Sequence, residues 1–152
     1  MTTGAPDTPR LARAAYEAMA ARARPIPAII VQGAADPVVK PINALHTRDL
    51  WLAMNAFARG ATPETATSPA TPTRRAETEA GGLGVVTECY GIATSKCEVE
   101  MLTVAGLGHA WSGGSKLGTF TDERGPDATA EMLRFLLAHR MSAAPGPNAG
   151  RP

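Results

Sequence analysis

The sequence is poor in aromatic residues, has only two cysteines and shows no charge imbalance, and each of these scarcities excludes a class of protein. A formal net charge of +1 gives no electrostatic reason to expect binding to nucleic acid or to an acidic lipid surface. No apolar run approaches the ~20 residues that a membrane-spanning helix needs. The Ala/Arg-rich first 24 residues lack the continuous apolar stretch of a secretory signal peptide. We therefore expect no nucleic-acid partner, no membrane span and no signal peptide in this sequence.

A length of 152 residues favours one domain, and the order of the sequence patterns is that of an α/β protein. Apolar runs predict strands, and apolar residues at helical spacing predict amphipathic helices. The predicted elements are a helix over 9–24, a strand over 27–32, a helix over 41–58, a flexible insertion over 60–83, a hairpin over 84–104, a helix over 126–140 with a buried stripe of Met132, Phe135, Leu136 and Met141, and a disordered tail over 142–152.

The two cysteines, Cys89 and Cys97, lie in the two predicted strands of the hairpin or at their inner ends. A hairpin centred on Ala93 places them directly opposite each other, where facing Cβ atoms are ~4.5–5.5 Å apart. That separation is within adjustment distance of a disulfide. The sequence thus offers two interpretations, a disulfide that indicates an exported protein or two unrelated buried thiols.

Two polar motifs follow strand-like runs, at the places where α/β proteins carry their active sites. Asp36 lies in Gly-Ala-Ala-Asp-Pro-Val-Val after the first strand, and His109 lies in Gly-Leu-Gly-His-Ala-Trp-Ser-Gly-Gly after the last. If these strands are parallel, both residues lie at the same edge of the sheet. We expect Gly106 and Gly108 to adopt backbone conformations closed to other residues and to leave space beside the imidazole. An aspartate so placed can orient a histidine as a catalytic base, the alternatives being an ordinary turn aspartate and a loop histidine.

An acid and a base about 70 residues apart are the last two members of a catalytic triad in the chain order of the α/β-hydrolases. The first member is missing, because the sequence contains neither a Gly-x-Ser-x-Gly motif nor an HGGG-type oxyanion loop. Ser112 lacks the strand–turn–helix setting of a nucleophile, and we interpret it as a support for its turn. His46 and His139 lie in predicted helices without HExxH or CxxC spacing, so we expect no metal site and no cofactor.

Several segments together resemble the C-terminal portion of the poly(3-hydroxybutyrate) depolymerase family, over about residues 10–140. They are Gln-Gly-Ala-Ala-Asp-Pro-Val-Val-Lys-Pro-Ile-Asn, the His109 motif, Gly-Thr-Phe-Thr-Asp, Gly-Pro-Asp-Ala and the final Met-Leu-Arg-Phe-Leu-Leu. The family consists of secreted-type esterases with the α/β-hydrolase fold, related to feruloyl and acetylxylan esterases. The resemblance implies that residues 1–141 form the C-terminal half of a mostly parallel sheet with flanking helices, plus a hairpin. In the complete fold, strand 27–32 would be an interior strand.

The resemblance also implies site roles, with Asp36 as the triad acid, His109 as the base and Trp111 as an aromatic wall of the substrate cleft. It implies hydrolysis of a short-chain hydroxyalkanoate ester or a related ester by acyl transfer, without a cofactor, in a secreted or periplasmic protein. The serine elbow and oxyanion loop have no counterpart here, so we expect the isolated chain to be inactive unless another chain supplies the N-terminal half. The alternatives are a non-catalytic remnant that binds an ester or a partner chain through the Trp111 cleft, and a fragment without a role.

Overall fold

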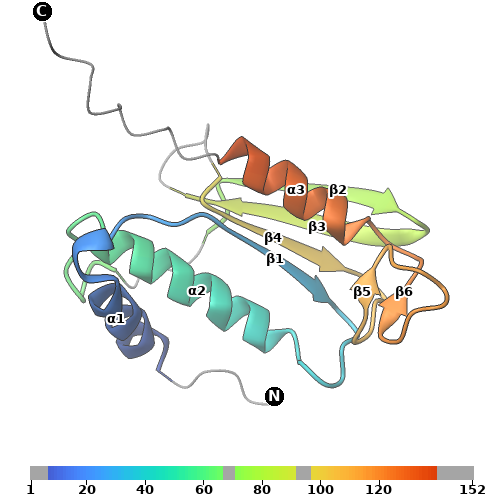
Figure 1. Cartoon of the computed structure of the whole chain (residues 1–152), viewed down its shortest axis with the longest axis horizontal. Helices are drawn as coiled ribbons and strands as arrows, with labels where there is room; N and C mark the ends of the chain where they lie inside the picture. Colours follow the sequence, from blue (N-terminus) through green and yellow to red (C-terminus); the bar gives the residue numbers. More distant parts are fainter. Residues whose placement is uncertain (1–6, 67–70, 92–96, 140–152) are drawn as a thin grey trace, which may run out of the picture.

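The computed structural model describes residues 7–66, 71–91 and 97–139, which form a four-stranded sheet with helices on both of its faces (Figure 1). A second sheet is a short two-stranded pair. No helix in these ranges combines the length and the apolar character needed to cross a bilayer. In chain order the elements are α1 (Thr8–Met19), the 3-10 helix η1 (Ala20–Arg22), β1 (Ala28–Gly33), α2 (Ile42–Phe57), β2 (Arg74–Ala80), β3 (Leu83–Tyr90), β4 (Val99–Val104), β5 (Trp111–Ser112), β6 (Thr121–Asp122) and α3 (Ala128–Ala138).

The main sheet has the strand order β1-β4-β3-β2 and is mixed. β1 runs parallel to β4, whereas β3 is antiparallel to both of its neighbours, β4 and β2. The mixed α/β content and the β3–β4 hairpin match the sequence analysis, but the expected mostly parallel sheet is not what these residues form. The reason is connectivity: α2 lies between β1 and the later strands, but β2, β3 and β4 follow one another through short connections, which join antiparallel neighbours.

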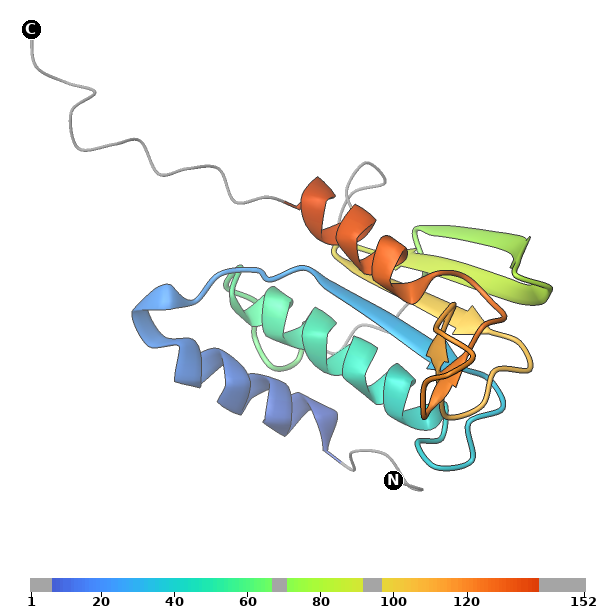
Figure 2. The ribbon, with the colours of Figure 1, turned by 45° about the vertical axis from the view of Figure 1, so that its right-hand side comes forward.

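The helices α2 and α3 cover opposite faces of the sheet (Figure 2). Since successive residues of a strand point to opposite faces, neighbouring residues of one strand contact different helices. On β4, Val99 and Met101 pack against the α2 side in a buried cluster with Tyr90. The residue between them, Glu100, faces α3 and forms an ion pair with Arg134. The core of the sheet therefore lies between α2 and the central strands, with α3 completing the other face.

The helix α1 packs against α2 rather than against the sheet, and together they bury a second cluster. Its first turn is capped by Asp7, whose side chain accepts a hydrogen bond from the Arg10 N–H at 3.2 Å. The sequence predicted this helix over 9–24, but the α-helix ends at Met19, because Ala20 adopts a φ of +47° and starts the tighter η1 turn. The buried members of the second cluster are Ala12, Ala53, Met54, Phe57 and Ala66.

The prediction of a loop throughout residues 60–83 is wrong in one part, because Arg74–Ala80 form the strand β2. β2 is polar and almost wholly exposed, so it carries no apolar periodicity that would have predicted a strand. It forms because Gly81 and Gly82, at φ values of +54° and +77°, make a two-residue turn that pairs Ala80 with Leu83. A Gly-Gly dipeptide is a recognised signal for such a hairpin, so this part of the sequence does contain evidence for the turn between β2 and β3.

A disulfide joins Cys89 and Cys97, whose Cα atoms are 5.3 Å apart. The register expected from a hairpin centred on Ala93 is nevertheless wrong. Cys89 lies opposite Glu100 in the ladder, and Cys97 precedes the first residue of β4. The disulfide therefore links the end of β3 to the segment that leads into β4, rather than bridging two facing strand positions.

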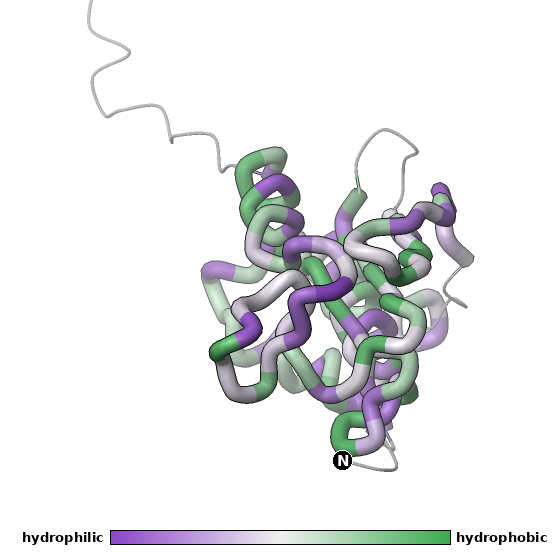
Figure 3. Tube along the Cα trace, turned by 90° about the vertical axis from the view of Figure 1, so that its right-hand side faces the viewer, coloured by the Kyte–Doolittle hydropathy of each residue, from purple (hydrophilic) through white to green (hydrophobic). Residues whose placement is uncertain are grey.

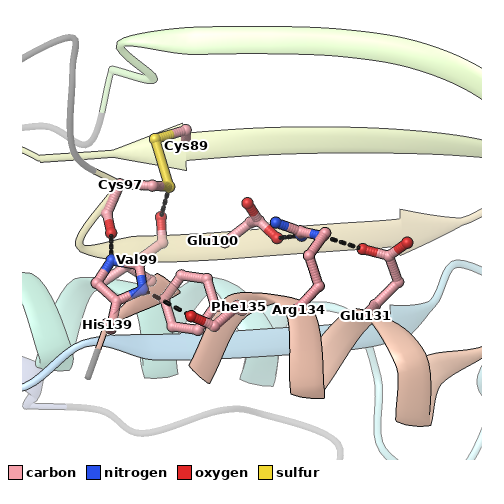
Figure 4. Close-up of polar contacts among 8 residues, drawn as sticks. All are labelled: Cys89, Cys97, Val99, Glu100, Glu131, Arg134, Phe135 and His139. Atoms are coloured by element: carbon pink, nitrogen blue, oxygen red, sulfur yellow. Dashed lines mark hydrogen bonds and ion pairs between the residues drawn. A yellow bond between two sulfur atoms is a disulfide. The ribbon is translucent and has the colours of Figure 1, made fainter. Parts of the chain in front are cut away.

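The helix α3 is anchored at two places, one on β4 and one on the segment that leads into it (Figure 4). Arg134 forms ion pairs with the buried Glu100 and with Glu131. At the helix end, Nε2 of His139 lies 2.5 Å from the carbonyl oxygen of Cys97, and Nδ1 lies 2.8 Å from that of Phe135. The disulfide, the hairpin and the end of α3 are thus joined in one cluster.

The buried stripe predicted for this helix is only partly correct. Phe135 is buried, but Leu136 is 54% exposed, and Met141 lies outside the described residues. Leu136 is turned about 100° away from Phe135 around the helix axis. Together with the half-exposed Leu133 and Leu137, it gives α3 an apolar face that no other described residue covers.

Opening the disulfide should destabilise the fold measurably. Replacing both cysteines by alanine removes a covalent link across a sequence separation of 8, which should lower the free energy of unfolding by about 2–3 kcal/mol. Urea denaturation with and without reductant measures the effect: reductant should shift the wild-type transition to that of the double variant and leave the variant unchanged. Identical wild-type transitions in both conditions would contradict the prediction.

Candidate active site

The parallel pairing of β1 with β4 brings the loops that follow the two strands together at one edge of the sheet. The pairing continues past the strand ends, because the Ala34 N–H donates to the Val104 carbonyl at 2.9 Å and the Ala35 N–H donates to the Leu107 carbonyl at 3.0 Å. Figure 3 looks onto this end of the molecule, where β5 and β6 lie. The sequence positions of Asp36 and His109 fall in these two joined loops.

Close approach of the two loops depends on a glycine at the end of β1. A Cβ atom on Gly33 would lie 2.4 Å from the carbonyl oxygen of Leu107 and 2.5 Å from that of Gly108. On the other loop, Gly106 has a φ of +71°, a conformation that favours glycine. The corresponding expectation for Gly108 is wrong, since its φ is not positive and an added Cβ would meet only open space.

Asp36 and His109 form a hydrogen-bonded pair. Nδ1 of His109 lies 2.9 Å from Oδ2 of Asp36. The other carboxylate oxygen, Oδ1, accepts hydrogen bonds from the N–H groups of Val38 and Val39, both at 2.8 Å. The carboxylate is therefore held on both oxygens and its side chain is only 8% exposed, whereas the imidazole is 42% exposed.

The surroundings of Asp36 favour its ionised form. Burial by itself raises the pKa of the carboxyl, but the hydrogen bonds from His109, Val39 and Val38 outweigh this effect and hold the pKa below its ordinary value. A carboxylate that accepts the bond at Nδ1 assigns the proton of a neutral imidazole to that nitrogen. The lone pair is then on Nε2, where a histidine can take a proton from a nucleophile.

The pair lies in an open cleft of about 340 Å³ at the carboxyl ends of β1 and β4. Two aromatic side chains, Trp111 and Phe120, line the cleft with His109. Trp111 is 44% exposed. The ring of Phe120 meets the imidazole nearly edge-on, with ring centroids 6.0 Å apart and an interplanar angle of 73°. The cleft can therefore receive an apolar group beside the imidazole.

Phe120 was not singled out from the sequence, although it is the middle residue of Gly-Thr-Phe-Thr-Asp. Its φ of +57° is unusual for a residue with a bulky side chain. The conformation is held by the backbone, because the Phe120 carbonyl accepts a hydrogen bond from the Trp111 N–H at 2.8 Å at the start of the β5–β6 pair. Such backbone outliers cluster at functional sites, and no single-residue signal in the sequence reveals them.

Ser112 holds its turn and does not face the imidazole. Its hydroxyl donates to the Pro126 carbonyl at 2.7 Å, and the residue is 1% exposed. Ser115, the other serine within the described ranges, uses its oxygen to accept a hydrogen bond from the Leu117 N–H at 3.2 Å. No side chain of the described residues forms a hydrogen bond with Nε2 of His109. The nucleophile of a triad is therefore not among the groups that this part of the chain presents to the base.

The other two histidines lie away from this cleft. His139 contacts the carbonyl oxygens of Phe135 and Cys97, and His46 lies half-buried in α2 with its Nδ1 unpartnered. Within the described ranges, no cluster of three or more His, Cys, Asp or Glu side chains is arranged to hold a metal ion.

Comparison with known proteins adds no further evidence about the site. No protein-family model matches this sequence, and no curated protein matches it at a significant level. The assignment of the cleft therefore depends on its own geometry.

The lowered pKa of Asp36 predicts a specific acid sensitivity. Its folded-state pKa lies below the unfolded value of about 3.9, so ionised Asp36 contributes stability that is present above about pH 5 and is lost as the pH falls through the lowered pKa. The Asp36→Asn variant should be less stable than wild type near neutral pH, and its stability should change less between pH 5 and pH 2. Urea denaturation over that pH range measures both effects.

The control for removal of a carboxylate is Glu79→Gln, on the exposed strand β2. It should reproduce the wild-type acid dependence. An Asp36→Asn curve parallel to wild type would contradict the prediction, because it would show that titration of Asp36 does not contribute to the acid sensitivity.

Proposed function

We propose that this chain supplies the acid and the base of a serine-type ester hydrolase, with Asp36 orienting His109. The observation that carries the proposal is the pair itself: a buried, ionised carboxylate bonded to Nδ1 of a half-exposed imidazole, in a cleft at the ends of two parallel strands. This is the arrangement that acyl-transfer chemistry requires of its acid and base. The sequence resemblance to the poly(3-hydroxybutyrate) depolymerases points to the same chemistry on an α/β-hydrolase fold.

In this reaction His109 would act through Nε2. It would first remove the proton from an attacking hydroxyl and then donate that proton to the leaving alkoxide of the ester. Asp36 would keep the ring in the required tautomer and stabilise the imidazolium that forms in between. In the second half of the reaction, Nε2 would take a proton from the water that attacks the acyl intermediate and donate it to the nucleophile's oxygen as the acyl bond breaks.

The lining of the cleft favours a substrate with a small apolar group next to His109, in either its acyl part or its alcohol part. Trp111 and Phe120 offer two aromatic surfaces, and Leu107 and Val39 add aliphatic ones. A short-chain hydroxyalkanoate ester or a related ester, as the resemblance implies, is compatible with this lining. The disulfide supports the secreted or periplasmic location of that family, because disulfides persist in oxidising compartments.

We further propose that the nucleophile and the oxyanion-binding groups come from an N-terminal half of the fold that packs beside β1. β1 is the end strand of the described sheet, and its apolar residues Ile29, Ile30 and Val31 are only half-buried. Apolar runs of this kind are typical of interior parallel strands. A strand added parallel to β1 would end at the same edge of the sheet as Asp36 and His109.

The uncovered face of α3 supports the same interface. Arg134 and Leu136 lie on opposite flanks of the helix, because consecutive residues are separated by about 100°. Arg134 reaches Glu100 on β4, so the flank of Leu136 is turned toward the unpaired side of β1. A second layer packed beside β1 would cover both the strand and these leucines.

The competing proposal is a non-catalytic module that binds an ester or a partner chain through the same cleft. The observation in its favour is that no described side chain bonds to Nε2 of His109 and that Ser112 is turned into the loop. Activity measurements separate the two proposals.

The isolated chain should hydrolyse p-nitrophenyl butyrate no faster than its His109→Ala variant. An acid–base pair without a nucleophile or an oxyanion hole leaves little catalysis beyond that of water. Initial rates of the two purified proteins at equal concentration are the measurement. Turnover that Ser112→Ala abolishes would make Ser112 the nucleophile and overturn our interpretation of that residue.

Co-expression with the N-terminal half of a poly(3-hydroxybutyrate) depolymerase should restore ester hydrolysis. In that complex His109→Ala should remove nearly all activity, and Asp36→Asn should reduce kcat roughly 10⁴-fold by favouring the wrong tautomer. Leu136→Asp should weaken the complex, whereas Leu117→Asp, the same change at a residue that is 96% exposed, is the matched control. A complex that forms but stays inactive would favour the non-catalytic module.

A further inference from the structure

The end of β1 carries a buried amide side chain that joins the two ends of the loop bearing Asp36. Gln32 is 8% exposed, in a strand that is otherwise apolar up to that point. Its Nε2 donates to the Gly33 carbonyl at 2.8 Å and to the Val39 carbonyl at 3.1 Å. One NH₂ group thus uses both of its protons within the segment 33–39.

These bonds belong to the same network that fixes the carboxylate. Val39 is held from both sides, because its carbonyl accepts from Gln32 while its N–H donates to Oδ1 of Asp36. The Gly33 carbonyl likewise accepts from Gln32 and from the Asp36 N–H, the latter at 3.3 Å. The amide of Gln32 is therefore bonded to Gly33 and Val39, the two residues whose backbone groups form hydrogen bonds with Asp36 from either side.

We propose that Gln32 is a positioning residue for the catalytic pair: its side chain closes the 33–39 loop and so keeps Oδ2 of Asp36 directed at Nδ1 of His109. The proposal rests on the proposed function for its catalytic meaning, but not for its geometry. Gln32 does not contact His109, and it acts only through Val39 and Gly33. Without the amide, the two carbonyls lose a buried donor, and the N–H groups that orient Asp36 are free to move with the loop.

A second buried amide, on helix α2, bonds to the backbone just before β1 and offers a matched control. Asn55 is 1% exposed, accepts a hydrogen bond from the Ile26 N–H at 2.8 Å and donates to the Ile26 carbonyl at 3.0 Å. It therefore satisfies backbone groups just before β1, as Gln32 does just after it. Loss of either amide should destabilise the fold by a comparable mechanism, but only Gln32 is connected to Asp36.

The test compares Gln32→Met with Asn55→Leu in the full chain. The readout is the low-field proton resonance of the His109 Nδ1–H, which reports the hydrogen bond to Asp36 without requiring any catalysis. Thermal unfolding of each variant measures the loss of stability alongside. The expected result is that Gln32→Met loses or markedly broadens the resonance, whereas Asn55→Leu keeps it at the wild-type position despite a similar loss of Tm.

Where Gln32→Met does not fold, Gln32→Asn replaces it, because this variant keeps a buried amide that is one methylene too short to reach both carbonyls. Loss of the resonance in that variant supports the proposal equally. A wild-type resonance in a folded Gln32 variant overturns it, and so does a parallel loss in Asn55→Leu, which would reduce Gln32 to a residue that only stabilises the fold. Since the wild-type chain must first show the resonance, its absence there would refute the pair on which the proposed function rests, before any Gln32 variant is compared.

Discussion

The candidate site depends on the close approach of two backbone segments at the end of the β1–β4 pair. Gly33 lies so near the carbonyls of Leu107 and Gly108 that no side chain fits between them. Backbone hydrogen bonds from Ala34 and Ala35 then carry the parallel pairing beyond the strands. With the loops joined in this way, a carboxylate on one and an imidazole on the other are placed within hydrogen-bond distance across a separation of 73 residues in sequence.

The two outer strands of the sheet differ in a way that bears on assembly. β2 ends the sheet with charged side chains that are exposed, including an Arg75–Glu77 ion pair, and this is how natural sheets discourage further pairing at an edge. β1 ends the other side with half-buried isoleucine and valine and with no such protection. The asymmetry is consistent with a free edge at β2 and with the proposed partner segment at β1.

Patterns that depend on neighbouring residues in the sequence predicted the larger elements well. The strand before Asp36, helix α2 and the helix near the C-terminus are apolar enough to be read from spacing alone, with differences of one or two residues at their ends. The residue types of the site were also readable, because an aspartate and a histidine in glycine-containing turns after strands are local features. Their 2.9 Å contact follows once the strands are parallel.

What the sequence could not provide depends on contacts that are distant in the chain or on backbone conformation. β2 is held by pairing with β3 rather than by burial, so hydrophobic periodicity could not reveal it. Hairpin register depends on where the turn begins, and Cys89 consequently faces Glu100 instead of Cys97. Exposure of Leu136 depends on what lies beside α3, and the positive φ of Phe120 depends on the loop that carries it.

Asp36 and His109 differ in how many of their polar atoms have hydrogen-bond partners among the described residues. Every bond that Asp36 needs comes from nearby groups: two backbone N–H groups on one oxygen and an imidazole on the other. Within the described ranges, His109 has a hydrogen-bond partner at Nδ1 alone, and its Nε2 is left to the cleft at the carboxyl end of β1. The hydrogen bonding of the Asp36–His109 pair, as the proposed function would use it, is therefore incomplete at the end of the same strand whose outer edge is unpaired in the described sheet. One added segment beside β1 could pair with the free edge of the strand and also place a group next to Nε2 of His109. A single missing segment therefore explains the two observations together.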